Sequence, residues 1–294
     1  MLTRKEIERI KESGEVPTVG LEIFDTINNF KFDDKTLDNE KYVLEMYKEY
    51  IEEILTMEKE HVNNYLSVLK SAEIIDNQSL ENEDSFLMAL YRQIAKENTI
   101  DYLLDHHQNL TKNSFIKGQS ILLEGTSSDV FSKENLRTDD ETFILRKQND
   151  EEKIVYFAIN NNDIDEAIEK FLAIYNSDIY DNNIFLKSQI VHGLIATLQM
   201  FYDGNTRYAR ILQNIKLWDL TRKKEQYPLE NPAIYGTRSY FPYREEYRKL
   251  IGNIAVSNTK EAWNDWFKFN LNRMIDHIYF LENKLSNYKR VLKR

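Results

Sequence analysis

A short polar break between two apolar segments holds the residues of this chain that are best placed for chemistry. The break covers residues 202–206, Tyr-Asp-Gly-Asn-Thr, and the apolar segments cover 184–201 and 207–220. Both segments repeat their apolar residues at helical spacing, so the sequence predicts a buried helix, a sharp turn and a second helix. The N–H groups at the start of the second helix favour an anion, and Gly204 lets a ligand approach the backbone closely.

Charged side chains flank this break. Arg207 and Arg210 are three residues apart and share one face of the first helical turn, where cations oppose the helix dipole unless an anion offsets them. Asp203 offers oxygen to a hard cation such as Mg²⁺. The spacing also allows a second interpretation, in which Gly204 ends the first helix, Asp203 and Asn205 cap the second, and both arginines lie in solvent.

The residue types at the break also follow a known signature. Residues 201–210 read F-x-D-G-N-x-R-x-x-R, which resembles the Fic (Fido) family signature H-x-F-x-[DE]-G-N-G-R-x-x-R, and His192 stands where that family's longer run has its first His. The resemblance implies a mainly α, Fic-type helical bundle with a small β-hairpin flap. It also implies a site that binds ATP and Mg²⁺ and moves AMP onto a hydroxyl side chain of a target protein.

The resemblance assigns functions to individual residues. Asp203 would hold Mg²⁺ and take part in catalysis. Two residues depart from the signature, because Gln199 replaces the catalytic His and Thr206 replaces the second Gly. A neutral amide cannot accept a proton, and a positioned base contributes roughly 10²–10⁴-fold in rate, so the resemblance supports nucleotide binding more strongly than transfer. The residues expected to bind the nucleotide are Gly204, Asn205, Thr206, Arg207, Arg210 and Tyr240.

A second motif lies upstream, where residues 120–125 read Ser-Ile-Leu-Leu-Glu-Gly. Taken locally, it predicts a short apolar helix ended by a Gly, with Glu124 as a surface acid beside the helix end. It resembles the inhibitory-helix motif [ST]-x-x-x-E-[GN] of the Fic class whose inhibitory helix precedes the core. The resemblance implies that Ser120 and Glu124 belong to an inhibitory helix at about 118–126. Glu124 would pair with Arg210 and block the γ-phosphate of ATP.

The composition predicts an ordinary soluble globular protein. With 294 residues, 35.1 kDa and 41% hydrophobic residues, the chain is long enough to bury a full core. A net charge of −10 argues against binding to nucleic acid or an anionic membrane, since either needs a basic face. Absence of Cys, of an apolar leader and of any long apolar run leads us to expect a cytoplasmic protein without disulfides.

The scarcity of Gly and Pro predicts a mostly helical chain. We expect an N-terminal helical region over 1–110, with amphipathic helices at 42–69 and 84–104. A Fic-like domain would follow over 111–294, ending in a helix at 275–292 whose last residues are basic.

β-formers on both sides of the polar turn at 148–153 predict a hairpin, the flap, at about 141–159. An exposed hairpin edge can align an extended target by strand addition, which is the role that the resemblance implies. Further along the chain, Trp266 and Phe269 lie at helical spacing and are expected in the core.

Three functions agree with these observations. The first is an autoinhibited AMP transferase, impaired at Gln199, that modifies protein hydroxyl groups. The second is a catalytically inactive nucleotide-binding or protein-interaction module, which explains Gln199 and Thr206 directly. The third is removal of AMP from a modified protein, with Glu124 positioning water. The sequence leaves the target protein unidentified and a homodimer open.

Overall fold

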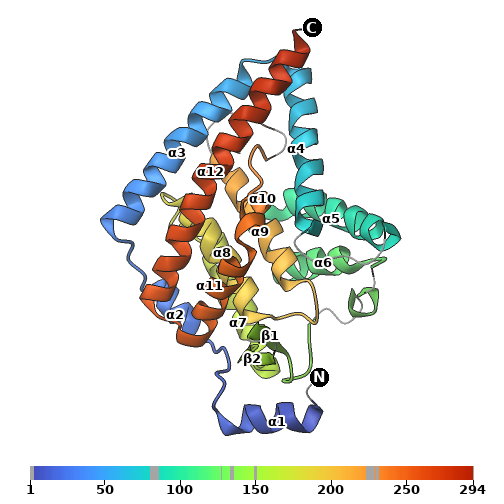
Figure 1. The fold of residues 1–294 in the computed structure, drawn as a ribbon, viewed down its shortest axis with the longest axis vertical. Coiled ribbons are helices and arrows are strands. Elements are labelled where there is room, and N and C mark those ends of the chain that lie inside the picture. Colours follow the sequence, from blue (N-terminus) through green and yellow to red (C-terminus); the bar gives the residue numbers. More distant parts are fainter. Residues whose placement is uncertain are drawn as a thin grey trace.

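The computed structural model describes residues 3–79, 86–126, 128–132, 136–148, 151–222, 229 and 232–293. The architecture is mainly helical, with one two-stranded antiparallel hairpin (Figure 1). The strands are β1 (Phe143–Gln148) and β2 (Glu151–Phe157). The helices are α1 (Arg4–Ser13), α2 (Glu22–Asn28), α3 (Asp34–Leu55), α4 (Lys59–Ser79), α5 (Phe86–His106), α6 (Lys112–Leu123), α7 (Ile164–Asn176), α8 (Ile184–Leu198), α9 (Asn205–Arg222), α10 (Thr237–Tyr240), α11 (Arg244–Ser257) and α12 (Lys260–Leu292).

Helix α8 is the centre of the molecule, because every one of its residues is buried. It packs against α9, α11, α12, α7 and α3. The close approach of α12 depends on Gly193, since a Cβ there would lie 2.8 Å from Trp263 Cζ3. Trp266 donates its indole N–H to the Gln189 carbonyl at 3.0 Å. The predicted buried helix is therefore present, and Trp266 and Phe269 lie in the core as predicted.

The hairpin lies beside the site end of the central helices (Figure 1). Its register pairs Phe143 with Phe157 and contains an irregularity after Ile144. The N-terminal segment continues this small sheet, because the Phe157 N–H donates to Pro17 O at 2.9 Å and the Val19 N–H donates to Phe157 O at 3.0 Å. The edge of β2 is thus partly covered at its base by the chain's own N-terminal segment.

Helix α3 runs alongside α12 and reaches the N-terminus of α8 (Figure 1). Glu40 of α3 is buried and accepts hydrogen bonds from Asn183 Nδ2 at 2.6 Å and Leu186 N at 3.1 Å. It therefore satisfies N–H donors at the start of α8 that have no acceptor within the helix. Burial raises the pKa of the Glu40 carboxyl to about 7, despite these two hydrogen bonds.

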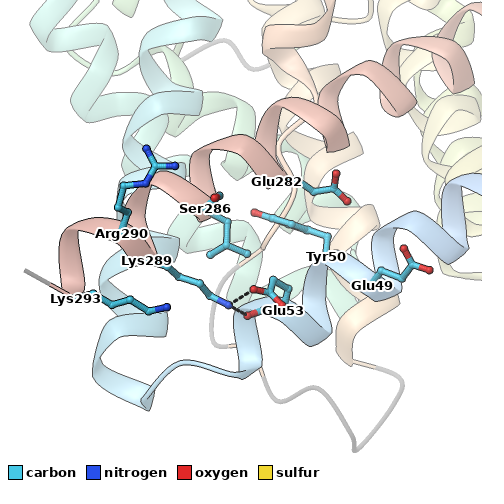
Figure 2. A pocket seen from close by; sticks show the side chains of 9 residues that line it. Glu49, Tyr50, Glu53, Glu282, Ser286, Lys289, Arg290 and Lys293 are labelled. Atoms are coloured by element: carbon cyan, nitrogen blue, oxygen red, sulfur yellow. Dashed lines mark hydrogen bonds and ion pairs between the residues drawn. The ribbon is translucent and has the colours of Figure 1, made fainter.

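The predicted boundaries of the helices at 42–69 and 275–292 were wrong. The expected helix at 42–69 is divided, because α3 ends at Leu55 and α4 begins at Lys59. Lys289 of α12 contacts the end of α3, because it donates to the Glu53 carbonyl at 2.7 Å (Figure 2). It also donates to Thr56 Oγ1 at 2.7 Å. The last helix begins at Lys260, well before the expected 275.

One buried core includes side chains from Val19 to Leu285, so residues on both sides of the proposed boundary at 110 contribute to it. The division at 110 remains a prediction. Among the described residues, no helix is long and apolar enough to cross a membrane.

Candidate active site

The polar break adopts a sharp turn. Helix α8 ends at Leu198, three residues before the expected end, because Gln199 takes the left-handed conformation with φ 52°. Helix α9 begins at Asn205, directly after Gly204, whose φ is +76°. A Cβ on Gly204 would lie 2.8 Å from Gln119 Nε2 and 3.3 Å from Leu123 Cδ2. Glycine is required here both by the backbone angle and by the approach of α6.

Side-chain hydrogen bonds hold the backbone of the break in place. Asn205 closes the turn on itself, since its Oδ1 accepts from Phe201 N at 3.0 Å and its Nδ2 donates to Phe201 O at 2.7 Å. The buried Arg137 donates its Nε–H to Gln199 O at 2.8 Å. From α6, Gln119 donates to Asp203 O at 2.5 Å. The side-chain amide of Asn205 is therefore used to hold the turn.

Asp203 is held by three donors. Its carboxylate accepts from Arg207 Nη2 at 2.8 Å, from Ser128 Oγ at 2.5 Å and from Gly204 N at 2.6 Å. Burial opposes the charged form, but Arg207, Ser128 and the Gly204 N–H together keep the pKa of Asp203 below its ordinary value. Asp203 is therefore an anion at neutral pH.

Asp203 could hold Mg²⁺ only together with oxygen atoms of a bound ligand. No group of three His, Cys, Asp or Glu side chains among the described residues could hold a metal ion. One carboxylate together with phosphate oxygens is a common way of holding Mg²⁺. A metal at Asp203 would compete with Arg207 for this carboxylate. Nη1 of Arg207 is buried and has no hydrogen-bond partner, so this side chain has a donor left for an anion.

A cavity of about 450 Å³ opens at the break, between the hairpin and the ends of α8, α9 and α11. It brings together three of the predicted site residues, Gln199, Thr206 and Arg210. Arg210 is almost fully buried, whereas Thr206 is half-buried at the first turn of α9. The N–H groups of this turn have no acceptor within the helix, so the cavity floor combines them with a guanidinium group. The cavity is lined by Ile144, Leu145, Arg146, Val155, Tyr156, Ala196, Gln199, Thr206, Arg210, Arg244, Glu245, Tyr247, Arg248, Ile251 and Gly252.

The structure does not bring the upstream motif to Arg210. Helix α6 ends at Leu123, so Glu124 follows the helix rather than forming part of its last turn. The Glu124 side chain is 51% exposed and lies 3.4 Å from Lys117 Nζ, and it makes no contact with Arg210. Ser120 is buried within α6 and does not line the cavity. The expected Glu124–Arg210 pair is therefore not formed in this conformation.

Tyr240 lies in the core, not at the cavity. Its side chain is 2% exposed, and its hydroxyl donates to Asn270 Oδ1 at 2.7 Å and accepts from Gln213 Nε2 at 3.0 Å. Tyr240 therefore does not line the cavity in this structure, and its contact with adenine stays a prediction. A different tyrosine, Tyr247, does line the cavity.

His192 belongs to the same buried network. Its Nδ1 lies 2.5 Å from Gln213 Oε1, and its Nε2 lies 2.7 Å from Tyr247 Oη. Because an amide oxygen only accepts, we assign the proton to Nδ1, and the Tyr247 hydroxyl then donates to Nε2. Burial, with a smaller contribution from Arg210, lowers the pKa of His192 to about 3. His192 is thus neutral and structural, and cannot serve as the missing base.

Several residues of the cavity wall were not predicted from the sequence. Arg146 comes from the hairpin, while Arg244 and Arg248 come from one face of α11. The spacing of the last two is visible in the sequence but resembles an ordinary solvated helix face. Arg137, which holds the turn, gives no local signal at all, because its partner lies 62 residues away.

A second pocket of about 490 Å³ lies between α3 and α12, far from the break (Figure 2). The basic side chains Arg290 and Lys293 lie toward one end of it, and the acidic side chains Glu49 and Glu282 lie toward the other. Figure 2 shows Lys289 bound to the carbonyl and carboxylate of Glu53. Since that pairing neutralises a central charge and no signature residue is present, we do not place the active site there.

Comparison with known proteins agrees with this geometry. Residues 99–217 match the profile of the Fic/DOC family, and no curated protein matches the chain. A Fic family protein from Desulfovibrio desulfuricans aligns with a TM-score of 0.59 at 12% identity, over 87% of this chain and 76% of its own. Fic-1 from C. elegans aligns with a TM-score of 0.60 at 12% identity, over 86% and 73%. A Fic domain containing signaling protein from Bacteroides thetaiotaomicron aligns with a TM-score of 0.56 at 11% identity, over 85% and 98%.

Residues 99–217 are therefore similar to a Fic/DOC family domain. Its fold is Fic-like, mainly helical with a two-stranded antiparallel hairpin, as the sequence predicted.

Proposed function

We propose that this protein binds a nucleotide with its phosphates at the N-terminus of α9, and that it transfers AMP to protein hydroxyl groups only slowly. The observation that carries the proposal is the shared cavity of Gln199, Thr206 and Arg210 at a helix N-terminus. Backbone N–H groups, the helix dipole and a buried guanidinium group all favour a phosphate at this point.

The proposed reaction needs no covalent bond to the protein. The oxygen of a target hydroxyl would bond to the α-phosphorus of ATP, the bond from that phosphorus to the bridging oxygen would break, and pyrophosphate would leave. Mg²⁺, when bound, would neutralise charge on the phosphates and would be held by Asp203. The hydroxyl proton must go to a base, and Gln199 lies where the family places one. Because the Gln199 amide cannot accept a proton, the transfer step should be slow.

Two further parts of the proposal concern access to the cavity. An extended target would add to the edge of β1, because Pro17 and Val19 already occupy the base of the β2 edge. Glu124 would inhibit only after leaving Lys117 and turning toward Arg210. The exposed Glu124–Lys117 pair contributes little to stability, so it does not hold Glu124 away strongly.

A non-catalytic interaction module is the second candidate function. It is favoured by one observation, the Gln199 amide, which donates to Ala196 O at 2.6 Å and so is used to end α8. In that case the cavity would bind a nucleotide, or a partner, without turnover.

Calorimetric titration with ATP and Mg²⁺ tests the binding proposal. Thr206→Asp should abolish binding, because it adds an anion at the cavity floor, whereas Arg238→Ala should not, since Arg238 stacks on Phe280 outside the cavity. Arg210→Ala should also abolish binding. Since Arg210 is buried, thermal unfolding must show that this variant is folded. If wild type and Thr206→Asp gave the same heat of binding, the phosphate site at α9 would be disproved.

A further inference from the structure

A segment that follows α6 lies against the carboxylate proposed to hold Mg²⁺. We name it the cap segment and define it as residues 124–126 and 128–132. Local hydrogen bonds fold it on itself, and in one of them Gly125 N donates to Asp129 Oδ1 at 3.2 Å. Its last part is one turn of 3₁₀ helix, Asp129–Ser132, that packs against α6. The cap segment is therefore a compact unit that continues from α6.

The cap segment reaches the break at two neighbouring residues. Ser128 Oγ donates to Asp203 Oδ2 at 2.5 Å. The Phe131 ring stacks on the Tyr202 ring, with 5.0 Å between the ring centroids. All four side chains are only partly buried. These two contacts hold the segment against the break without making it part of the core.

Ser128 occupies an acceptor position of Asp203. Asp203 Oδ2 accepts from Ser128 and also from Arg207 Nη2 at 2.8 Å. Asp203 Oδ1 is bound to the turn itself, because it accepts from Gly204 N at 2.6 Å. A carboxylate oxygen has two lone pairs, so both acceptor positions of Oδ2 are filled. A cation that binds at Oδ2 must displace one of its two donors.

The two donors differ in how easily they can leave. The Arg207 side chain is charged and 5% exposed, and it comes from the first turn of α9. Taking it away from Asp203 would leave a buried guanidinium group without this counter-charge, which is costly. The Ser128 hydroxyl is neutral and partly exposed, so it can bind water instead. Ser128 is therefore the donor that a metal would displace.

We infer that Ser128 gates the metal position, so that the cap segment has to release Asp203 before Mg²⁺ can bind there with a nucleotide. The inference rests on the proposed function, because it takes Asp203 to share Mg²⁺ with the phosphates of the nucleotide. Ser128 is then a positioning residue, which acts through Asp203 rather than on the nucleotide.

Calorimetry of the full chain with ADP, once with Mg²⁺ and once with EDTA, tests the gate. ADP is used because it lacks the γ-phosphate that Glu124 is proposed to block. Ser128→Ala should tighten binding of ADP with Mg²⁺ by about fivefold or more, equal to roughly 1 kcal/mol, since the metal no longer has to break a hydrogen bond. Binding of ADP in EDTA should stay unchanged. Ser71→Ala is the matched control and should change neither affinity, because the Ser71 hydroxyl bonds to the Ser67 carbonyl within α4.

Phe131→Ala tests whether the whole segment moves. This variant keeps the Ser128 hydroxyl and removes the second attachment, the stacking on Tyr202. A gate predicts that ADP with Mg²⁺ binds this variant more tightly too, by about twofold or more. An unchanged affinity would show that release of the segment is not required, which refutes the gate.

The remaining outcomes separate the gate from the proposed function. If wild type binds ADP with Mg²⁺ and Ser128→Ala binds it equally or more weakly, Ser128 supports Asp203 instead of gating it; the inference is then refuted and the proposed function stands. If Ser128→Ala tightens ADP equally with Mg²⁺ and with EDTA, the segment obstructs the nucleotide rather than the metal, which also refutes the inference. If ADP binds neither protein under either condition, the inference and the proposed function fail together.

Discussion

Replacing Gln199 by His should restore the missing base, and the structure shows how. The backbone at Gln199 is left-handed, a conformation that His adopts more readily than most residues with a side chain. Gln199 Nε2 donates to the Ala196 carbonyl, and the Nδ1–H of an imidazole could take over this hydrogen bond. That bond would fix the tautomer and leave the other ring nitrogen as an acceptor in the cavity beside Thr206 and Arg210.

The expected gain follows from the value of a positioned base. Such a base accelerates proton transfer by roughly 10²–10⁴-fold, equivalent to about 3–5 kcal/mol of barrier. Label from α-labelled ATP should therefore enter protein at least about 10²-fold faster in Gln199→His than in wild type. The protein's own flap and N-terminal segment are the nearest acceptors. Label from γ-labelled ATP should stay in solution, because the proposed product carries AMP.

Two controls make the experiment decisive. Gln199→Ala removes the amide without adding a base, so it should label no faster than wild type. Thr206→Gly, combined with Gln199→His, tests whether the Thr206 side chain obstructs the phosphate site. If both His-containing variants bound Mg²⁺–ATP and still labelled no more protein than Gln199→Ala, our placement of the base would be refuted.

Three further predictions concern other parts of the molecule. Glu124→Gly should tighten ATP binding, and Lys117→Ala should weaken it by releasing Glu124, as measured by calorimetry; equal affinities would exclude Glu124 from the site. Glu40 has a folded-state pKa near 7, above its unfolded value, so its contribution to stability is full below pH 4.5 and is lost as pH rises through 7. Urea unfolding should show that Glu40→Gln removes roughly 3 kcal/mol of this pH dependence, and an unchanged dependence would contradict the burial of the carboxyl. Gly193→Ala should lower the free energy of unfolding by roughly 1–3 kcal/mol through overlap with Trp263, and a midpoint at or above that of wild type would disprove the close packing.

Periodicity and turn chemistry were enough to predict the centre of this fold. The apolar repeat of α8 indicates burial, because apolar residues lie on more than one face of the helix. Gly204 indicates the turn, because glycine readily adopts a positive φ that most other residues avoid, and its φ here is positive. The hairpin was equally visible from its β-formers and its polar turn.

Features set by distant contacts could not be predicted in this way. Helix α3 ends where Lys289 meets Glu53, and these residues are separated by 236 positions. Tyr240 was expected at the nucleotide, yet its hydroxyl is used by Asn270 and Gln213. In each case the local sequence allows two outcomes, and a tertiary hydrogen bond decides between them.

The structure also explains how a site of this kind could keep its shape without its catalytic base. The turn is held by Asn205, Arg137 and Gln119, which bond to backbone atoms and make no use of the side chain at 199. Replacing a His by Gln199 therefore removes proton transfer but leaves the turn, the start of α9 and Arg210 in position. Binding and chemistry depend on different residues here, so a chain that lost transfer would still be expected to bind a nucleotide. Asn205→Ala tests this separation, because it should abolish nucleotide binding and lower stability together, whereas Gln199→Ala should leave nucleotide binding unchanged.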